Sequence, residues 1–144
     1  MTGHIEPTEA QLERLMASGI EGPVTMLNLL RYRDVADYSE HAGLAPTEPV
    51  SGREAYGLYS AGVLPILAGL GAAPVFFGAC NPTVIGPDDE QWDDMALIRY
   101  PDLATFAGMV ASAEYQAIMG HRTAALADSR LVPTDAVAVP DGSA

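Results

Sequence analysis

The pattern of hydrophobic and polar positions along the chain changes its period several times, and each change predicts a different element. Residues 24–32 and 95–100 alternate between two faces, as strands do. In the first segment both faces are largely apolar, which is typical of a strand buried on both sides. Another strand is predicted at 75–80. The last is predicted at 130–132 and 136–139, around a proline that favours the edge of a sheet.

Apolar residues at helical spacing fill the stretches between these strands. Capping boxes at residues 8–11 and 51–54 predict helices over 8–18 and 51–70. Residues 34–50 have no period and indicate a long loop. After Pro101 a single long helix is predicted, whose apolar face carries Tyr115, Ile118, Met119, Arg122 and Leu126.

The resulting order is helix, β, α, β, β, α, β, in one domain that spans residues 1–144. A leading helix and turn (1–22) precede a core (24–132) and a C-terminal tail (133–144). Without its leading helix the order is that of the ferredoxin-like α+β fold, βαββαβ, in which two helices cover one face of a four-stranded antiparallel sheet. The other face would be bare and apolar, so we expect a homodimer in which two sheets face each other.

Composition and charge narrow the range of functions. The chain carries 19 acidic and 7 basic residues, a net charge of −12, which disfavours nucleic acid and membranes as partners. All basic residues are arginine, so Schiff-base chemistry and a P-loop lysine are excluded. The single cysteine and the absence of a signal peptide favour a cytoplasmic protein. No metal-ligand spacing or nucleotide-binding motif is present, so neither a metal nor an organic cofactor is expected.

Polar residues at otherwise apolar positions are the candidates for a functional site. Arg122 lies on the apolar helix face, so its head group is expected to be buried against a carboxylate or a cavity. Asn28 and Arg31 lie on opposite faces of the first strand, and we expect the uncharged Asn28 to face inward. We expect Asn28 and Arg122 to line a pocket between the sheet and the two long helices. His121 points off the apolar face, toward the mouth of this pocket, and could transfer protons. The remaining lining is expected from Tyr56, Tyr59, Arg99 and Tyr115.

Each of these residues also has a structural interpretation. One of the arginines at 31, 99 and 122 could form an ion pair with Asp93 or Asp128. Asn28 could bond neighbouring backbone, and the tyrosine rings could belong to the core. The acidic run around Trp92 is interpreted as a solvated rim.

Four segments of the chain resemble one known family. They are MLNLLRYR, SGREAYGLYSAGVLP, WDDMALIRYPDLATF and AEYQAIMGHRTAALADSRL, which together span roughly residues 24–132. In this order they are similar to the domain of unknown function 1330, within the dimeric α+β barrel superfamily. The resemblance implies a fold and a dimer but no established activity. Other members of the superfamily include cofactor-independent oxygenases, isomerases, cyclases and haem-degrading oxygenases, whose ligands generally lie between sheet and helices.

Three hypotheses about function follow. The first is a cofactor-independent isomerase, cyclase or oxygenase that acts on a small hydrophobic carbonyl- or phenol-bearing compound. In it, Arg122 and Asn28 would polarise an oxygen while His121 or a tyrosine moves a proton. The second is a non-catalytic ligand-binding or interaction protein. The third is a haem-binding oxygenase, for which Asn28, Trp92 and His121 are residues of the required types.

Overall fold

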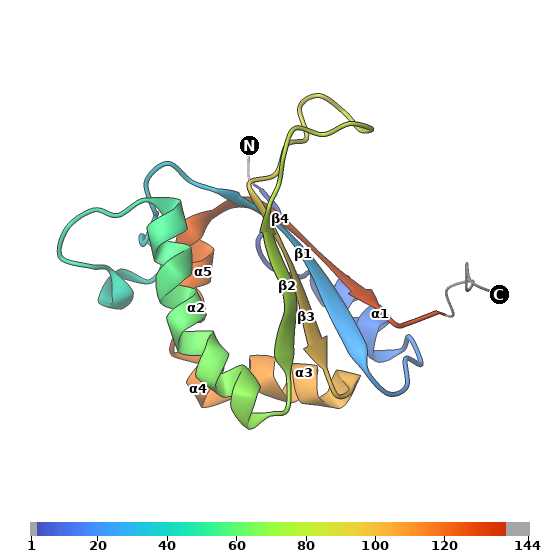
Figure 1. Ribbon diagram of the computed structural model, residues 1–144. Coiled ribbons are helices and arrows are strands. Elements are labelled where there is room, and N and C mark those ends of the chain that lie inside the picture. The colour runs from blue at the N-terminus through green and yellow to red at the C-terminus, as the bar shows by residue number, and fades with distance from the viewer. Residues whose placement is uncertain (1–2, 138–144) are drawn as a thin grey trace.

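The computed structural model describes residues 3–137 and contains one four-stranded antiparallel sheet (Figure 1). Its strands lie in the order β2-β3-β1-β4, so the first strand of the chain occupies an inner position. The strands are β1 (Val24–Tyr32), β2 (Ala73–Ala79), β3 (Asp94–Tyr100) and β4 (Leu126–Thr134). The ferredoxin-like α+β arrangement predicted from the order of elements is confirmed.

The first two helices begin at their predicted caps. α1 (Glu9–Met16) and α2 (Gly52–Gly69) each have a complete capping box, at Thr8 and Ser51 respectively. The loop between β1 and α2 is irregular apart from one turn of 3₁₀ helix, η1 (Ala42–Leu44). None of the helices within residues 3–137 is long and apolar enough to cross a membrane.

The prediction of a single long helix after β3 is wrong, because three short helices lie there. Ser112 separates the first two: its hydroxyl donates to the Met109 carbonyl at 2.7 Å and accepts from the Tyr115 amide at 3.2 Å. This side chain therefore ends one helix and caps the next, which apolar spacing alone could not reveal. The helices are α3 (Leu103–Ala111), α4 (Ala113–Gln116) and α5 (Met119–Ala125).

Replacing Ser112 with alanine tests this interpretation of the break. We expect Ser112→Ala to lower the free energy of unfolding by about 1 kcal/mol, the usual effect of losing a cap. Urea unfolding followed by circular dichroism measures the change. Ser60→Ala in α2 is the matched control, because the Ser60 hydroxyl makes no hydrogen bond within the described residues. Equal effects of the two substitutions would contradict the capping role of Ser112.

β4 begins earlier than predicted. Leu126, which was assigned to the helical face, is its first residue, and the strand continues past Pro133, which pairs with Met26 of β1. The predicted edge position is confirmed, since β4 has β1 as its only neighbour in the described sheet. Of the predicted extension, residues 136–137 are not in a strand, and 138–139 lie outside the described residues.

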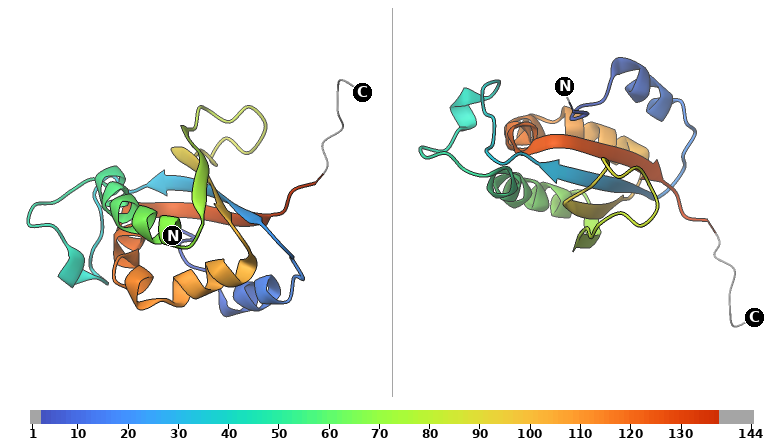
Figure 2. Two further views of the ribbon diagram at one scale, coloured as in Figure 1. Left: turned by 60° about the horizontal axis from the view of Figure 1, so that its bottom comes forward. Right: turned by 90° about the horizontal axis from the view of Figure 1, so that it is seen from above.

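Alternation along β1 separates two faces of the sheet. Val24, Met26 and Leu30 are at most 1% exposed and form the core together with the helices, which lie on the same side of the sheet (Figure 2). The leading segment also joins this side, because Ile5 and Leu15 pack against the same core. The leading helix therefore does not cover the other face.

The opposite face, here called the outer face, has an apolar centre. Leu27 of β1 is flanked by Leu97 of β3 and Val132 of β4, and Phe76 of β2 lies next to Leu97. Phe76 and Val132 remain 53% and 48% exposed. A sheet that exposes a contiguous apolar surface is typical of an interface.

Candidate functional site

Four tyrosine rings form a row between the sheet and the helices. Tyr32 of β1 contacts Tyr56 of α2 with ring centroids 5.6 Å apart, and Tyr56 contacts Tyr59 at 5.2 Å. Tyr59 contacts Tyr115 of α4 at 6.1 Å, and their hydroxyl oxygens lie 3.0 Å apart within hydrogen-bonding distance. The structure thus brings together three residues proposed for one site from the sequence, Tyr56, Tyr59 and Tyr115, and adds Tyr32. We call the four rings the tyrosine row.

Asn28 faces the helices and is 8% exposed. Its Nδ2 atom donates to the carbonyls of Met26 at 3.3 Å and Ala96 at 3.5 Å, so these two acceptors fix the orientation of the amide. Its Oδ1 atom accepts no hydrogen bond within residues 3–137. Because every fully enclosed side-chain nitrogen and oxygen in this part of the chain has a partner, Oδ1 retains contact with accessible space. Asn28 therefore presents an acceptor, and not the donor required to polarise a substrate oxygen.

Arg122 has an unusual partner for a partly buried guanidinium. Its Nη1 atom donates to the backbone carbonyl of Ile5 at 2.8 Å. Within the described residues no carboxylate lies within 4.0 Å of it, so the expected carboxylate partner is not observed. Asp128, one of the two proposed partners, instead binds Arg130 at 2.8 Å. The positive charge of Arg122 is left without a negative charge beside it.

The charge of Arg122 acts on the tyrosine hydroxyls. Burial raises the pKa of Tyr56, Tyr59 and Tyr100, and the nearby guanidinium of Arg122 opposes that rise in all three. These hydroxyls are therefore protonated at neutral pH and lie within electrostatic reach of Arg122. The Tyr56 hydroxyl makes no hydrogen bond in the described structure, and it is not fully enclosed. Its hydrogen-bonding capacity is therefore unused in the described structure.

Sequence reasoning missed a buried carboxylate at one end of the tyrosine row. Asp94 is 3% exposed and accepts from the Tyr32 hydroxyl at 2.6 Å and from Nη1 of Arg53 at 2.8 Å. The Arg53 guanidinium also lies 4.7 Å from the centre of the Tyr32 ring. Asp94 shares the inward parity of Ala96 and Tyr100, so alternation along β3 was the signal that could have identified it.

His121 lies apart from the tyrosine row. Its Nδ1 atom lies 2.7 Å from the hydroxyl of Tyr38, in the loop between β1 and α2, and the two rings meet edge to face. Arg122, the next residue, contacts the leading segment instead. The two proposed catalytic residues therefore face different neighbours, as positions about 100° apart on a helix do.

The ionisation of His121 should make stability depend on pH. Burial lowers the pKa of His121, so the folded protein keeps the ring neutral where the unfolded chain would be protonated. The stability of the fold that depends on a neutral His121 is fully present above about pH 6.5, the ordinary pKa of histidine in an unfolded chain. It is lost as the pH falls from there toward the lower pKa of His121 in the folded protein. We expect the free energy of unfolding to rise with pH in this window, less steeply in His121→Gln. Urea unfolding at a series of pH values measures it. Identical slopes in the two proteins would contradict the prediction.

The prediction that Arg99 lines the site is wrong. Arg99 is exposed and pairs with Thr25, so it belongs to the outer face, because Tyr100 takes the inward position beside it. Arg31 also lies on that face, where it and Arg130 place their guanidinium carbons 5.2 and 4.9 Å from the Trp92 ring. Trp92 is half-buried between these two cations, residues 81–89 before it are exposed as a rim would be, and Trp92 lies on the side of the sheet away from Asn28.

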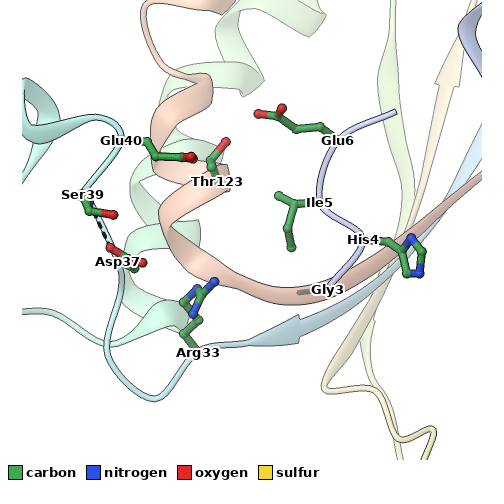
Figure 3. Close-up of a pocket in the computed structure, with 9 residues that line it drawn as sticks. All are labelled: Gly3, His4, Ile5, Glu6, Arg33, Asp37, Ser39, Glu40 and Thr123. Atoms are coloured by element: carbon green, nitrogen blue, oxygen red, sulfur yellow. Dashed lines mark hydrogen bonds between the residues drawn. The ribbon is translucent and has the colours of Figure 1, made fainter. Parts of the chain in front are cut away.

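A cavity of about 440 Å³ opens beside the leading segment, with an irregular loop opposite (Figure 3). Arg33 and Asp37 project toward it from the loop, and Ile5 and Thr123 face it from the leading segment and α5. A second cavity, about 330 Å³, is lined by loop residues 35–50. Neither is lined by the tyrosine row or Asn28, so neither is the pocket predicted there. The residues that line the first cavity are Gly3, His4, Ile5, Glu6, Arg33, Asp37, Ser39, Glu40 and Thr123.

Residues 46–134 match the model of a family described as domain of unknown function DUF1330. The chain belongs to the DUF1330 family. The match begins in the loop before α2, so it omits the first strand, although the resemblance in sequence extended back to residue 24. No curated protein is significantly similar to this DUF1330 member.

Solved structures of similar fold are also known. The RPA0582 protein, described as a protein of unknown function from Rhodopseudomonas palustris, is 36% identical over 96% of this chain and 100% of its own, with a TM-score of 0.85. A methylated form of the RPA0582 protein is 35% identical over 98% and 100%, with a TM-score of 0.87. A dabb family protein with a ferredoxin-like fold from Mesorhizobium loti is 10% identical over 82% and 100%, with a TM-score of 0.50, which shows the fold alone.

Proposed function

We propose that this DUF1330 protein binds a small hydrophobic molecule between its sheet and its helices, next to the tyrosine row. The ligand would contact Asn28, Tyr56 and Arg122. This proposal follows the general location of ligands in the superfamily and the polar atoms of this layer. A cofactor-independent enzyme acting on a carbonyl- or phenol-bearing compound is the activity that this site supports best.

The observation that carries the proposal is the lack of hydrogen-bond partners in this layer. Arg122 has a single backbone carbonyl as its partner, while the Tyr56 hydroxyl and the Asn28 Oδ1 atom have none within residues 3–137. Structural polar groups in a protein interior are normally fully bonded. Three groups with unused capacity on one side of the sheet are typical of a site that meets its ligand.

Proton transfer is the finer part of the proposal. His121 would act on a part of the ligand away from the tyrosine row, where its neutral ring, oriented through Nδ1 by Tyr38, would present Nε2 as a base. Arg122 would stabilise negative charge that develops on a ligand oxygen, and Asn28 would accept a hydrogen bond from a ligand hydroxyl. Isomerisation or cyclisation through an enolate fits these three roles.

We further propose that the protein acts as a homodimer that buries the outer face. The apolar residues at 27, 76, 97 and 132 support it, since a second copy can cover them without any additional element. The ligand site lies on the other side of the sheet, so dimerisation would leave it accessible.

Ligand-dependent thermal stability tests the binding proposal. We expect some members of a library of phenols, ketones and carboxylic acids to raise the Tm of the wild-type protein. Tyr56→Phe should have an unchanged Tm without ligand, because the hydroxyl it loses makes no hydrogen bond in the described structure. The same compounds should stabilise Tyr56→Phe and Asn28→Ala less. If no compound raises the Tm, or if both variants respond like the wild type, the proposed site is wrong.

A further inference from the structure

The start of the described chain is held against β4 and α5 mainly by side chains. The His4 amide donates to Oδ1 of Asp128 at 2.8 Å, and the Ser129 hydroxyl donates to the His4 carbonyl at 2.6 Å. Gly3 lies so close to β4 that a Cβ atom on it would overlap the Ala127 carbonyl oxygen. Together with the Arg122 bond to Ile5, these contacts hold residues 3–5, which we call the leading strap.

The strap gives Arg122 a poor partner. The neutral Ile5 carbonyl accepts one hydrogen bond from Arg122 and leaves its charge unbalanced, whereas a carboxylate can accept two parallel bonds from a guanidinium and neutralise its charge. Charge-assisted bonds of this kind are roughly twice as strong as neutral ones. A ligand carboxylate would therefore compete effectively with the Ile5 carbonyl for Nη1 of Arg122.

The charged side chains around the proposed ligand site leave the positive charge of Arg122 without a matching negative charge. The buried carboxylate of Asp94 is already bound to Arg53 and to the Tyr32 hydroxyl. The tyrosine hydroxyls near Arg122 are neutral at pH 7, since burial raises their pKa. Arg122 thus contributes a positive charge that no described side chain within 4.0 Å balances.

We infer that the ligand is an organic monocarboxylate whose carboxylate replaces the Ile5 carbonyl at Arg122 and displaces the leading strap. This inference rests on the proposed function, because it names the chemical class of ligand for the same site. The cavity of Figure 3 lies along the strap and is lined by Gly3, His4 and Ile5, so the strap borders open space on that side. Strap and ligand therefore compete, and loosening the strap favours the ligand.

Paired probes test the charge requirement. Aromatic and aliphatic monocarboxylates, from acetate to naphthoate, are each compared with the corresponding amide by calorimetry at pH 7. We expect at least one acid to bind about tenfold or more tightly than its amide, as loss of a charge-assisted bond predicts. Hydrogen exchange of the amides at residues 3–6 should become faster in that complex. Acids that bind no better than their amides would overturn the inference.

Two variants of β4 test the competition. Ser129→Ala removes the hydroxyl that holds the His4 carbonyl without touching Arg122, so affinity for the acid should rise about threefold to tenfold, the equivalent of one neutral hydrogen bond. Thr134→Ala, which removes a similar bond to the Thr25 carbonyl elsewhere on β4, should leave affinity unchanged. An unaltered affinity in Ser129→Ala, or slower exchange of the strap with ligand bound, would show that strap and ligand do not compete.

The outcomes separate this inference from the proposed function. If amides bind as well as acids and Tyr56→Phe weakens both, the binding site stands and its charge selectivity is wrong. If neither acids nor amides bind, the proposed binding function and the inferred preference for a carboxylate are both overturned.

Discussion

Leu97→Glu should convert the proposed dimer to a monomer. Leu97 lies on the outer face between Leu27 of β1 and Phe76 of β2, near the centre of its apolar surface. A two-fold axis through this face would bring two copies of the new carboxylate into an apolar interface. Burying and opposing these charges should weaken association by at least about 3 kcal/mol, roughly 150-fold in Kd. Analytical ultracentrifugation at micromolar concentration measures the change.

A matched charge elsewhere serves as the control for this substitution. Val84 is 94% exposed in the loop between β2 and β3, so Val84→Glu adds the same charge outside the outer face. The Val84 variant should remain dimeric, and the Leu97 variant should keep the circular dichroism spectrum of the wild type. A wild-type monomer, or a dimer that persists in Leu97→Glu, would show that the outer face is not the interface.

The parts of the fold that were predictable from sequence are those encoded by local periodicity. β1 was predicted to the residue, because its alternation is unbroken from Val24 to Tyr32. The capping boxes at Thr8 and Ser51 located two helix starts, since a cap depends on side chains three residues apart. The inward orientation of Asn28 also followed from a local rule, the high cost of burying Arg31 instead.

The features that escaped prediction depend on contacts distant in sequence or on single polar side chains. Ser112 breaks a segment whose apolar spacing remains helical on both sides, and this effect of one hydroxyl is invisible to periodicity. Alternation along β3 turns Asp94 inward, but its partners, Tyr32, 62 residues away, and Arg53, meet it only in three dimensions. The inward face of β3 was equally open to misassignment, which is why Arg99 was placed in the site although Tyr100 occupies that direction.

Arg122 combines a feature that local periodicity predicted with a contact that is distant in sequence. Its position on an apolar helix face predicted that its head group would be buried, and in the structure it is partly buried; its partner could only be found in the structure. That partner is a carbonyl of the leading strap, 117 residues away, rather than an aspartate. A carboxylate partner would have made Arg122 important for stability, since breaking a buried ion pair costs about 3–5 kcal/mol. With no such partner among the described residues, stability and ligand binding should separate at this position.

Arg122→Met tests that separation. Methionine retains the long apolar stem and removes the charge, so the variant loses one hydrogen bond to Ile5 but also the cost of partly burying a cation. We expect the free energy of unfolding to change by no more than about 1 kcal/mol, because these effects oppose each other. Affinity for a carboxylate ligand should instead fall by about 10- to 150-fold, the equivalent of roughly 1.5–3 kcal/mol for a hydrogen bond to a charged group.

Both quantities must be measured on the same preparations, by urea unfolding for stability and calorimetry for affinity. Met119→Leu, on the preceding turn of α5, is a control for repacking near Arg122 without a change of charge. A loss of several kcal/mol in Arg122→Met would assign Arg122 to the structural framework. Affinity that survives in the variant would place the ligand's negative charge elsewhere. Retained stability with lost affinity would identify Arg122 as a cation maintained for binding rather than for folding.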